Sequence, residues 1–264
     1  MANRVELRSD IAWSTPDRIG VHGYDLIRDI IGRVSFGDMA FLEITARLPE
    51  PRESRMFEAI LVTLVEHGIV PSTLAARLTY DGAPESVQGA VAAGLLGLGS
   101  VFVGSMENAA RMLSEALSDV GATEPLAPLA ERIVLRYRDS RQIVPGIGHP
   151  LHKPADPRAT RLVALAEEHG FRGRYVALME LVVEQAERTH GKPLPMNATG
   201  AIGALCCEMG LPWTVCRGIG VMARAVGLVG HILEESRRPI GVEVFQRTEE
   251  EASSHIRGKL REKA

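Results

Sequence analysis

The sequence predicts an all-α protein, and two observations support this. Residues that begin or end helices recur along the whole chain, and segments that alternate as strands do are scarce. No internal repeat, low-complexity segment or long linker is visible, so a second lobe is expected to be inserted and not joined by a tether. Of the 264 residues, 45% are hydrophobic and 24% are charged. This composition is ordinary for a soluble protein with one core or two unequal lobes.

At least eight helices are expected, each placed by local start and stop residues. Proline suits the first turn, serine, threonine and aspartate suit the N-terminal cap, and glycine ends many helices. The expected helices cover 51–68, a segment that begins at Pro84, 106–120, 123–137, 157–170, 174–190, 199–209 and 212–237. Ser105, Thr123 and Asp156 are the expected caps of the third, fourth and fifth of them.

The run 86–106 holds no charged residue and is about long enough to cross a bilayer. It also holds five glycines and three serines. That mixture favours a buried helix that ends in a glycine-rich loop over a membrane span.

Charge and cysteine content argue against several classes of protein. The formal net charge is −3 and no basic stripe is present, so a nucleic-acid partner is not expected. Three cysteines, of which Cys206 and Cys207 are adjacent, suit neither a disulfide framework nor a metal site. They are interpreted as buried thiols in a reducing compartment. The N-terminus lacks an apolar signal segment, so a cytoplasmic protein without a membrane partner is expected.

One arginine is expected to be buried. Arg224 lies in GIGVMARAVGLVGHILEE among apolar and small residues, and Gly220, Gly227 and His231 fall near it on one helical face. A buried guanidinium needs either an internal carboxylate or an anionic ligand. Because the glycines leave room for a close approach, a ligand is the favoured hypothesis and an internal ion pair is the alternative.

The segment VPGIGHPLHKPADPR, residues 144–158, predicts a second anion site. Asp156 as cap and Pro157 in the first turn place Arg158 at a helix N-terminus, where free amides and the helix dipole favour an anion. Glycines and prolines hold His149 on a stiff loop, and a histidine suits proton transfer near neutral pH. A surface loop with incidental histidines is the alternative.

Three further patterns carry less weight. His67 ends an apolar helix beside the turn at Gly68 and Pro71, where a histidine by itself is typical of a helix-terminal cation. GIGVMA, residues 218–223, fits a dinucleotide fingerprint, but no strand precedes it. The chain holds no GxSxG motif, so a serine hydrolase is not indicated.

Taken together, these segments resemble the citrate synthase family. VPGIGHPLHKPADPR is similar to the family's VPGxGHxxxxxxDPR loop, EHGIVPST to its DHE or DHG segment, and ARAVGLVGHILEE to its ARxxGxxxHxxE helix. The N-terminal stretch 23–51 is also similar, so the resemblance covers nearly the whole chain. GLLGLGSVFVGSMENAARML resembles the citryl-CoA lyase module of ATP citrate lyase, and the chain is much shorter than a typical citrate synthase. The lyase branch is therefore the closer one.

The resemblance implies a citrate synthase-like fold. Its large helical lobe is expected to comprise 1–104 and 213–264, and an inserted smaller helical lobe, 105–212, is expected to close over the substrate. Two chains are expected to form an intertwined homodimer, and whether dimers pair into tetramers is left open.

The resemblance also implies the site residues. Arg158, Arg224 and Arg238 match carboxylate ligands, with Arg238 reaching the other subunit's site, and His67 and His149 match histidines that hold the keto or hydroxyl oxygen. The loop from Ile143 to Lys153 matches the segment that cradles the adenine end of coenzyme A. Its expected coenzyme A contacts are Val144, Pro145, Gly146, Ile147, Gly148 and Lys153.

Two positions depart from the family pattern. Phe102 matches the histidine with which citrate synthases stabilise the acetyl-CoA enol, as in the lyase branch. Thr199, in MNATG, matches the catalytic aspartate, and a hydroxyl is a poor proton shuttle beside a carboxylate. Three alternatives follow from this departure. Another group held near Thr199 and Asn197 transfers the proton at the thioester carbon, or the reaction has changed, or activity is low.

The function implied is a citryl-CoA lyase-like carbon–carbon lyase. It cleaves a 3-hydroxy-3-carboxyacyl-CoA to acetyl-CoA and a 2-oxo acid such as oxaloacetate, with the coenzyme A ester as substrate and no permanently bound cofactor or metal. The alternatives are a condensing enzyme of citrate synthase type and a non-catalytic protein that binds a coenzyme A ester or a di- or tricarboxylate.

Overall fold

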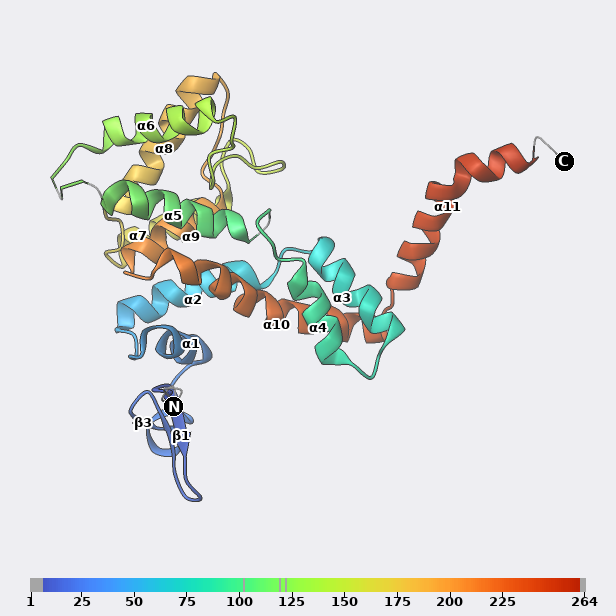
Figure 1. The fold of residues 1–264 in the computed structure, drawn as a ribbon, viewed down its shortest axis with the longest axis horizontal. Helices are drawn as coiled ribbons and strands as arrows, with labels where there is room; N and C mark the ends of the chain where they lie inside the picture. Colours follow the sequence, from blue (N-terminus) through green and yellow to red (C-terminus); the bar gives the residue numbers. More distant parts are fainter. Residues whose placement is uncertain (1–6, 102, 119, 122, 262–264) are drawn as a thin grey trace, which may run out of the picture. The chain divides into compact units, whose positions relative to one another are not determined.

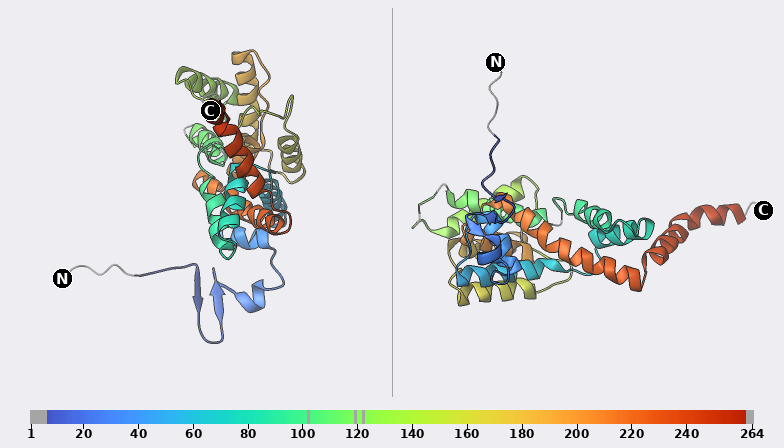
Figure 2. Two further views of the ribbon diagram at one scale, coloured as in Figure 1. Left: turned by 90° about the vertical axis from the view of Figure 1, so that its right-hand side faces the viewer. Right: turned by 90° about the horizontal axis from the view of Figure 1, so that it is seen from below.

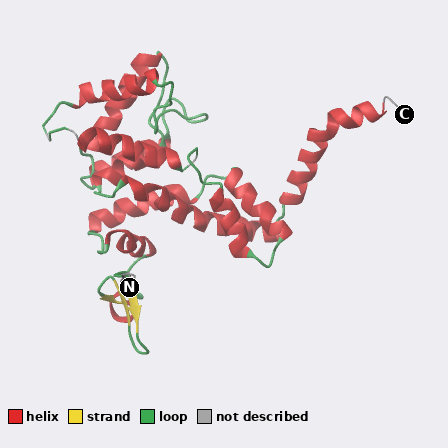
Figure 3. Cartoon of the chain, viewed as in Figure 1, coloured by secondary structure: helices red, strands yellow, loops and turns green. Residues whose placement is uncertain are grey.

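The computed structural model describes residues 7–101, 103–118, 120–121 and 123–261 and confirms the all-α prediction (Figure 1). Eleven α-helices contain most of the described residues, and the strands are confined to a short N-terminal segment (Figure 3). Phe102 lies outside the described residues. The chain's internal contacts divide it into two units, 1–63 with 106–216 and 64–105 with 217–264. The large and small lobes inferred from the family resemblance stay a prediction.

The first unit begins with a three-stranded antiparallel sheet that the sequence analysis did not predict. Its strands are β1 (Ala12–Ser14), β2 (Ile19–Val21) and β3 (Tyr24–Asp25), in the order β1-β2-β3. His22 and Gly23 join β2 to β3, both with positive φ, as a tight hairpin turn requires. A π-helical turn (Leu26–Ile30) follows, and Asp25 caps it.

Seven α-helices lie wholly or mostly in this unit. They are α1 (Phe36–Thr45), α2 (Pro51–Val65), α5 (Gly104–Ser118), α6 (Leu126–Asp139), α7 (Pro157–Glu168), α8 (Arg174–His190) and α9 (Ala198–Glu208). Helix α9 is apolar on all sides and packs against α7 and α8. At Gly203, a Cβ would lie 2.9 Å from the backbone of α5, so only glycine permits that approach.

The second unit is built from α3 (Pro71–Gly82), α4 (Val87–Leu96), most of α10 (Cys216–Arg237) and α11 (Gly241–Arg261). Helices α3 and α4 lie side by side (Figure 2). Their shared core contains Ala76, Ala90, Leu228 and Ile232, so α10 contributes to it. By length and composition alone the stretch Trp213–Arg237 could cross a membrane, a test that core helices of soluble proteins also pass.

Several helix boundaries were predicted correctly, and others were wrong. Asp156 caps α7 and accepts the backbone N–H of Arg158, and α8 covers the predicted residues. Pro84 lies in a turn and α4 begins at Val87, while α6 begins after Pro125 and is not capped by Thr123. Ser105 lies within α5, which begins at Gly104. The analysis did not predict α1, α3 or α11.

The three cysteines are free and buried, as expected. Burial is the main cause that raises the pKa of the Cys207 thiol to about 12, so this sulfur stays protonated at neutral pH.

Candidate functional site

The buried carboxylate of Asp156 joins the N-terminal ends of α7 and α9. Its Oδ1 accepts the backbone N–H of Arg158 at 3.0 Å, and its Oδ2 accepts the backbone N–H of Ala198 at 3.1 Å. Burial alone would raise the pKa of this carboxyl, but the hydrogen bonds from Arg158 and the backbone bring it below the ordinary value. The first turns of both helices are therefore held around one permanent negative charge.

The loop before α7 is bound to the segment before α9. Gly148 donates its N–H to the Pro195 carbonyl at 2.7 Å, and the Gly146 carbonyl accepts the N–H of Asn197 at 3.0 Å. A Cβ on Gly200 would overlap the Gly146 carbonyl, so this approach requires glycine at 200. Of the expected coenzyme A contacts, Val144, Gly146 and Ile147 are buried, Pro145 and Gly148 are half-buried, and Lys153 is exposed.

His149 follows this anchored stretch and has a defined tautomer. Its Nδ1 accepts backbone N–H groups from Leu151 at 3.1 Å and His152 at 3.0 Å. A nitrogen that accepts hydrogen bonds carries no proton, so the neutral ring is protonated at Nε2. The His152 ring stacks on it with centroids 4.3 Å apart. Arg158 Nη2 lies 3.4 Å from Nε2, and because both atoms then carry hydrogen, this contact is not a hydrogen bond. His149 therefore offers an N–H donor beside a guanidinium.

Asn197 and Thr199 form the first turn of α9. Asn197 Oδ1 accepts the backbone N–H groups of Thr199 and Gly200 and the Thr199 hydroxyl, the last at 2.7 Å. Asn197 Nδ2 donates to the Gly148 carbonyl at 2.8 Å, next to His149. The structure thus places Arg158, Asn197 and Thr199 around Asp156 and the start of α9, with His149 beside Arg158. That these residues form one substrate site stays a prediction.

Arg224, in the second unit, lies half-buried on α10. Its Nε and Nη1 are buried and have no hydrogen-bond partner among the residues that the structure describes. Burial lowers the pKa of this guanidinium, and the charge of Glu66 opposes the shift. An internal ion pair, the alternative considered from sequence, is not found for Arg224 within the described part of the chain. Two buried N–H donors without acceptors suit an anionic ligand.

His67 lies directly after α2, and Glu66 holds its backbone. Glu66 Oε1 accepts the backbone N–H groups of His67 at 2.8 Å and Gly68 at 2.6 Å. His231 Nε2 lies 3.0 Å from the same oxygen. His67 itself is exposed in the single chain.

The sequence analysis did not identify the buried arginine that contacts His231. Arg77, which is 1% exposed, contacts His231, Glu234 and Glu235. The only local signal was an arginine between apolar residues in LAARL, which by itself names no partner.

Arg238 follows α10 and is exposed in the single chain. Its backbone N–H bonds to the Glu234 carbonyl. That its side chain reaches the partner's site stays a prediction.

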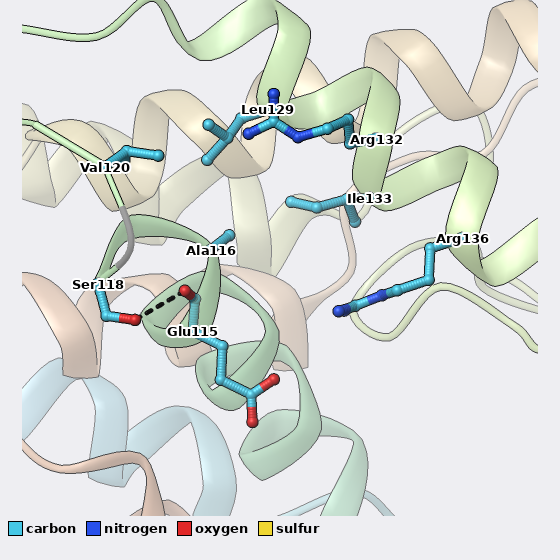
Figure 4. Close-up of a pocket in the computed structure, with 8 residues that line it drawn as sticks. All are labelled: Glu115, Ala116, Ser118, Val120, Leu129, Arg132, Ile133 and Arg136. Atoms are coloured by element: carbon cyan, nitrogen blue, oxygen red, sulfur yellow. Dashed lines mark hydrogen bonds between the residues drawn. The ribbon is translucent and has the colours of Figure 1, made fainter.

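A surface cavity of about 510 Å³ lies between α5 and α6 (Figure 4). Arg132 and Arg136 from α6 and Glu115 from α5 line it with several apolar side chains. None of the predicted site residues contributes to this lining. Within the described ranges, no group of three or more His, Cys, Asp or Glu side chains is placed to hold a metal ion.

The sequence and the fold match known proteins over most of the chain. A family model described as "Citrate synthase, C-terminal domain" matches residues 27–241. The solved citryl-CoA lyase from Hydrogenobacter thermophilus is 36% identical, with 87% of this chain and 86% of that chain covered and a TM-score of 0.79. ATP citrate lyase from Methanothrix soehngenii, solved with citrate and coenzyme A, shares the fold at 21% identity, with a TM-score of 0.73 over 90% of this chain and 40% of that chain.

Curated relatives are longer than this chain. An ATP-citrate synthase subunit 1 from Sordaria macrospora is 27% identical over 83% of the chain and 33% of its own length. A citrate synthase from Synechocystis is 27% identical over 73% of the chain and 47% of its own length. The chain therefore spans about a third to a half of these two relatives.

Proposed function

Because the chain belongs to the citrate synthase family, we propose that it is a citryl-CoA lyase-like carbon–carbon lyase. Its substrate is a 3-hydroxy-3-carboxyacyl-CoA, and its products are acetyl-CoA and a 2-oxo acid of the oxaloacetate type. The observation that carries this choice within the family is the match to a citryl-CoA lyase over nearly the full length of both chains. The match to citrate synthases covers only about half of those proteins.

The arginines bind the substrate carboxylates. Arg224 offers two buried donors, and Arg158 is oriented by Asp156 at the N-terminus of α7, where the helix dipole also favours an anion. Arg238 is proposed to act from the partner subunit of a homodimer. When its carboxylates are held in this way, the substrate has its carbon–carbon bond in position for cleavage before the reaction begins.

His149 acts on the substrate oxygen. As the carbon–carbon bond breaks, the hydroxyl proton passes to a solvent molecule that acts as the base, and negative charge develops on this oxygen. The Nε2–H of His149 stabilises that charge, and His67 is proposed to contact the same oxygen.

The departing enolate needs a proton on carbon, and Thr199 stands where the family has an aspartate. The Thr199 hydroxyl donates its hydrogen to Asn197 Oδ1. The lone pairs of the hydroxyl oxygen are therefore what can orient the group that gives a proton to the enolate. A solvent molecule held there would lie at the N-terminus of α9, which favours developing negative charge.

The coenzyme A ester is a substrate in this proposal, with its adenine end on the loop 143–153. No permanently bound cofactor and no metal take part. The protein is proposed to act in the cytoplasm as a homodimer.

Turnover of synthetic citryl-CoA tests the proposal. We expect release of a 2-oxo acid, followed by its NADH-dependent reduction with an added dehydrogenase. Faster condensation of acetyl-CoA with oxaloacetate than cleavage would support the condensing-enzyme alternative. Binding of coenzyme A esters in a thermal-shift screen without any turnover would support the non-catalytic alternative, which Thr199 favours.

A further inference from the structure

The turn that carries His67 is fixed from both sides. On one side, Glu66 accepts the two backbone N–H groups of His67 and Gly68. On the other side, the buried hydroxyl of Thr73 accepts the N–H of Val70 at 2.8 Å. The side chains of Glu66 and Thr73 therefore hold the backbone between α2 and α3 in place.

A directional chain of hydrogen bonds leads from the core to Glu66. Arg77 donates from Nη1 to Glu235 at 2.5 Å, and from Nε and Nη2 to His231 Nδ1 at 3.1 and 2.8 Å. A guanidinium has no acceptor atom, so Nδ1 of His231 must be the acceptor and carries no proton. The proton of the neutral ring is then on Nε2, which donates to Glu66 Oε1 at 3.0 Å.

The same carboxylate lies against α10 near Arg224. A Cβ on Gly227 would overlap the Val65 carbonyl and lie 3.3 Å from Glu66 Oε2, so glycine at this position lets the end of α2 reach the helix. Gly227 lies about one turn after Arg224 and one turn before His231. The hydrogen bonds from His231 and the backbone lower the pKa of Glu66 although burial alone would raise it, and the ionised group in turn favours the charged form of Arg224.

We propose that Arg77, His231 and Glu66 are positioning residues of the substrate site. Their chain of hydrogen bonds holds the His67 turn against α10, so that His67 and Arg224 act on one ligand, an oxygen next to a carboxylate. His231 transfers no proton in this role. The identity of the ligand rests on the proposed function.

Two substitutions of His231 separate positioning from acid–base catalysis. In His231→Gln, the amide oxygen can accept from Arg77 and the amide N–H can donate to Glu66, whereas His231→Leu can do neither. We expect His231→Leu to lower kcat for citryl-CoA cleavage about 10²-fold, with a smaller change in KM, because misplacement by about 1 Å costs that much. His231→Gln should stay within a few-fold of the wild type and keep its pH profile.

Arg247→Met is the control and should leave kcat unchanged, since that arginine pairs with Glu243 on the exposed face of α11. Normal kcat in His231→Leu would overturn the proposal. A second result would also overturn it: a loss of kcat in His231→Gln as large as that in His231→Leu, together with the loss of one limb of the pH–rate profile. His231 would then be an acid–base catalyst.

Amide hydrogen exchange tests the inference without any enzymatic activity. Exchange at His67 and Gly68, compared with amides of α9 in the same sample, should be faster in His231→Leu and in Glu66→Ala than in the wild type, His231→Gln or Arg247→Met. Glu66 is half-exposed, so Glu66→Ala keeps the test available if His231→Leu does not fold. Unchanged exchange in Glu66→Ala would overturn the inference. Absence of citryl-CoA cleavage by the wild type would overturn only the proposed function.

Discussion

The buried carboxylate of Asp156 accepts two hydrogen bonds from the guanidinium of Arg158, from Nε at 3.1 Å and from Nη2 at 2.8 Å. The same carboxylate caps α7 and accepts the first backbone N–H of α9. Arg158 is therefore oriented within the protein itself, and the start of α9, with Asn197 and Thr199, is positioned by the same group.

Asp156→Asn is expected to lower the free energy of unfolding by about 3–5 kcal/mol at pH 7, the range for removal of one partner from a buried ion pair. The pKa of Asp156 is lowered in the folded state. Its contribution is therefore complete above the ordinary carboxyl pKa of about 3.9 and is lost as the pH falls through the lower folded value.

Urea unfolding at pH 7 and at several values below pH 4 measures both effects. The difference in stability between wild type and Asp156→Asn should shrink in the acidic range. Asp139→Asn, which removes an exposed partner of Arg138, is the matched control and should change little at any pH. Equal stability of wild type and Asp156→Asn at pH 7 would contradict the central role given to this carboxylate.

Arg224→Met is expected to weaken binding of citrate by about 2–5 kcal/mol, the cost of removing one partner of a buried, hydrogen-bonded charge pair. The methionine keeps the apolar stem and removes a charge whose buried Nε and Nη1 lack a partner within the described residues. The free energy of unfolding should therefore stay the same or rise. Calorimetric titration with citrate and urea unfolding measure the two quantities, and unchanged citrate affinity would remove Arg224 from the site.

His149→Ala is expected to lower kcat by about 10²-fold or more and to change the affinity for a coenzyme A ester much less. The reason is that Nε2–H stabilises charge on the reacting oxygen, whereas the stretch 146–148 is anchored to the segment before α9 by backbone and Asn197 hydrogen bonds that do not involve the imidazole. Steady-state kinetics and calorimetry with acetyl-CoA give the two values. Near-normal kcat would show that this ring has only a structural role.

Thr199→Asp is expected to raise the rate of citryl-CoA cleavage and to promote deuterium exchange at the methyl group of acetyl-CoA when a 2-oxo acid is present. Asn197 Oδ1 lies 2.7 Å from the Thr199 hydroxyl, and an acceptor so close favours a protonated carboxyl, the form that can give a proton to carbon. Exchange is measured by NMR.

Thr199→Val removes only the hydroxyl at nearly constant volume. It should slow the native reaction and leave citrate binding intact. If the wild type and Thr199→Asp both fail to turn over any coenzyme A ester that they bind, the lyase proposal is wrong and the protein is a binding protein.

Local chemistry made much of the fold predictable. Asp156 followed by Pro157 is a local signal for a helix start, and α8 ends at Gly191 with the left-handed backbone that glycine tolerates. Other boundaries were wrong for equally local reasons. The strands of two or three residues are too short to show alternation, and Pro84 and Thr123 have residue types that suit turns as well as helix starts.

The sequence by itself determined most of the helices, the family, and candidate residues such as Arg158 and His149 that share one short segment. Only the tertiary structure decided which charges meet. Arg77 and His231 are 154 positions apart, and Asp156 and Ala198 are 42 apart. Caps and helical periods depend on neighbours along the chain, whereas a buried ion pair or a histidine tautomer depends on which helices pack together, and no local pattern encodes that choice.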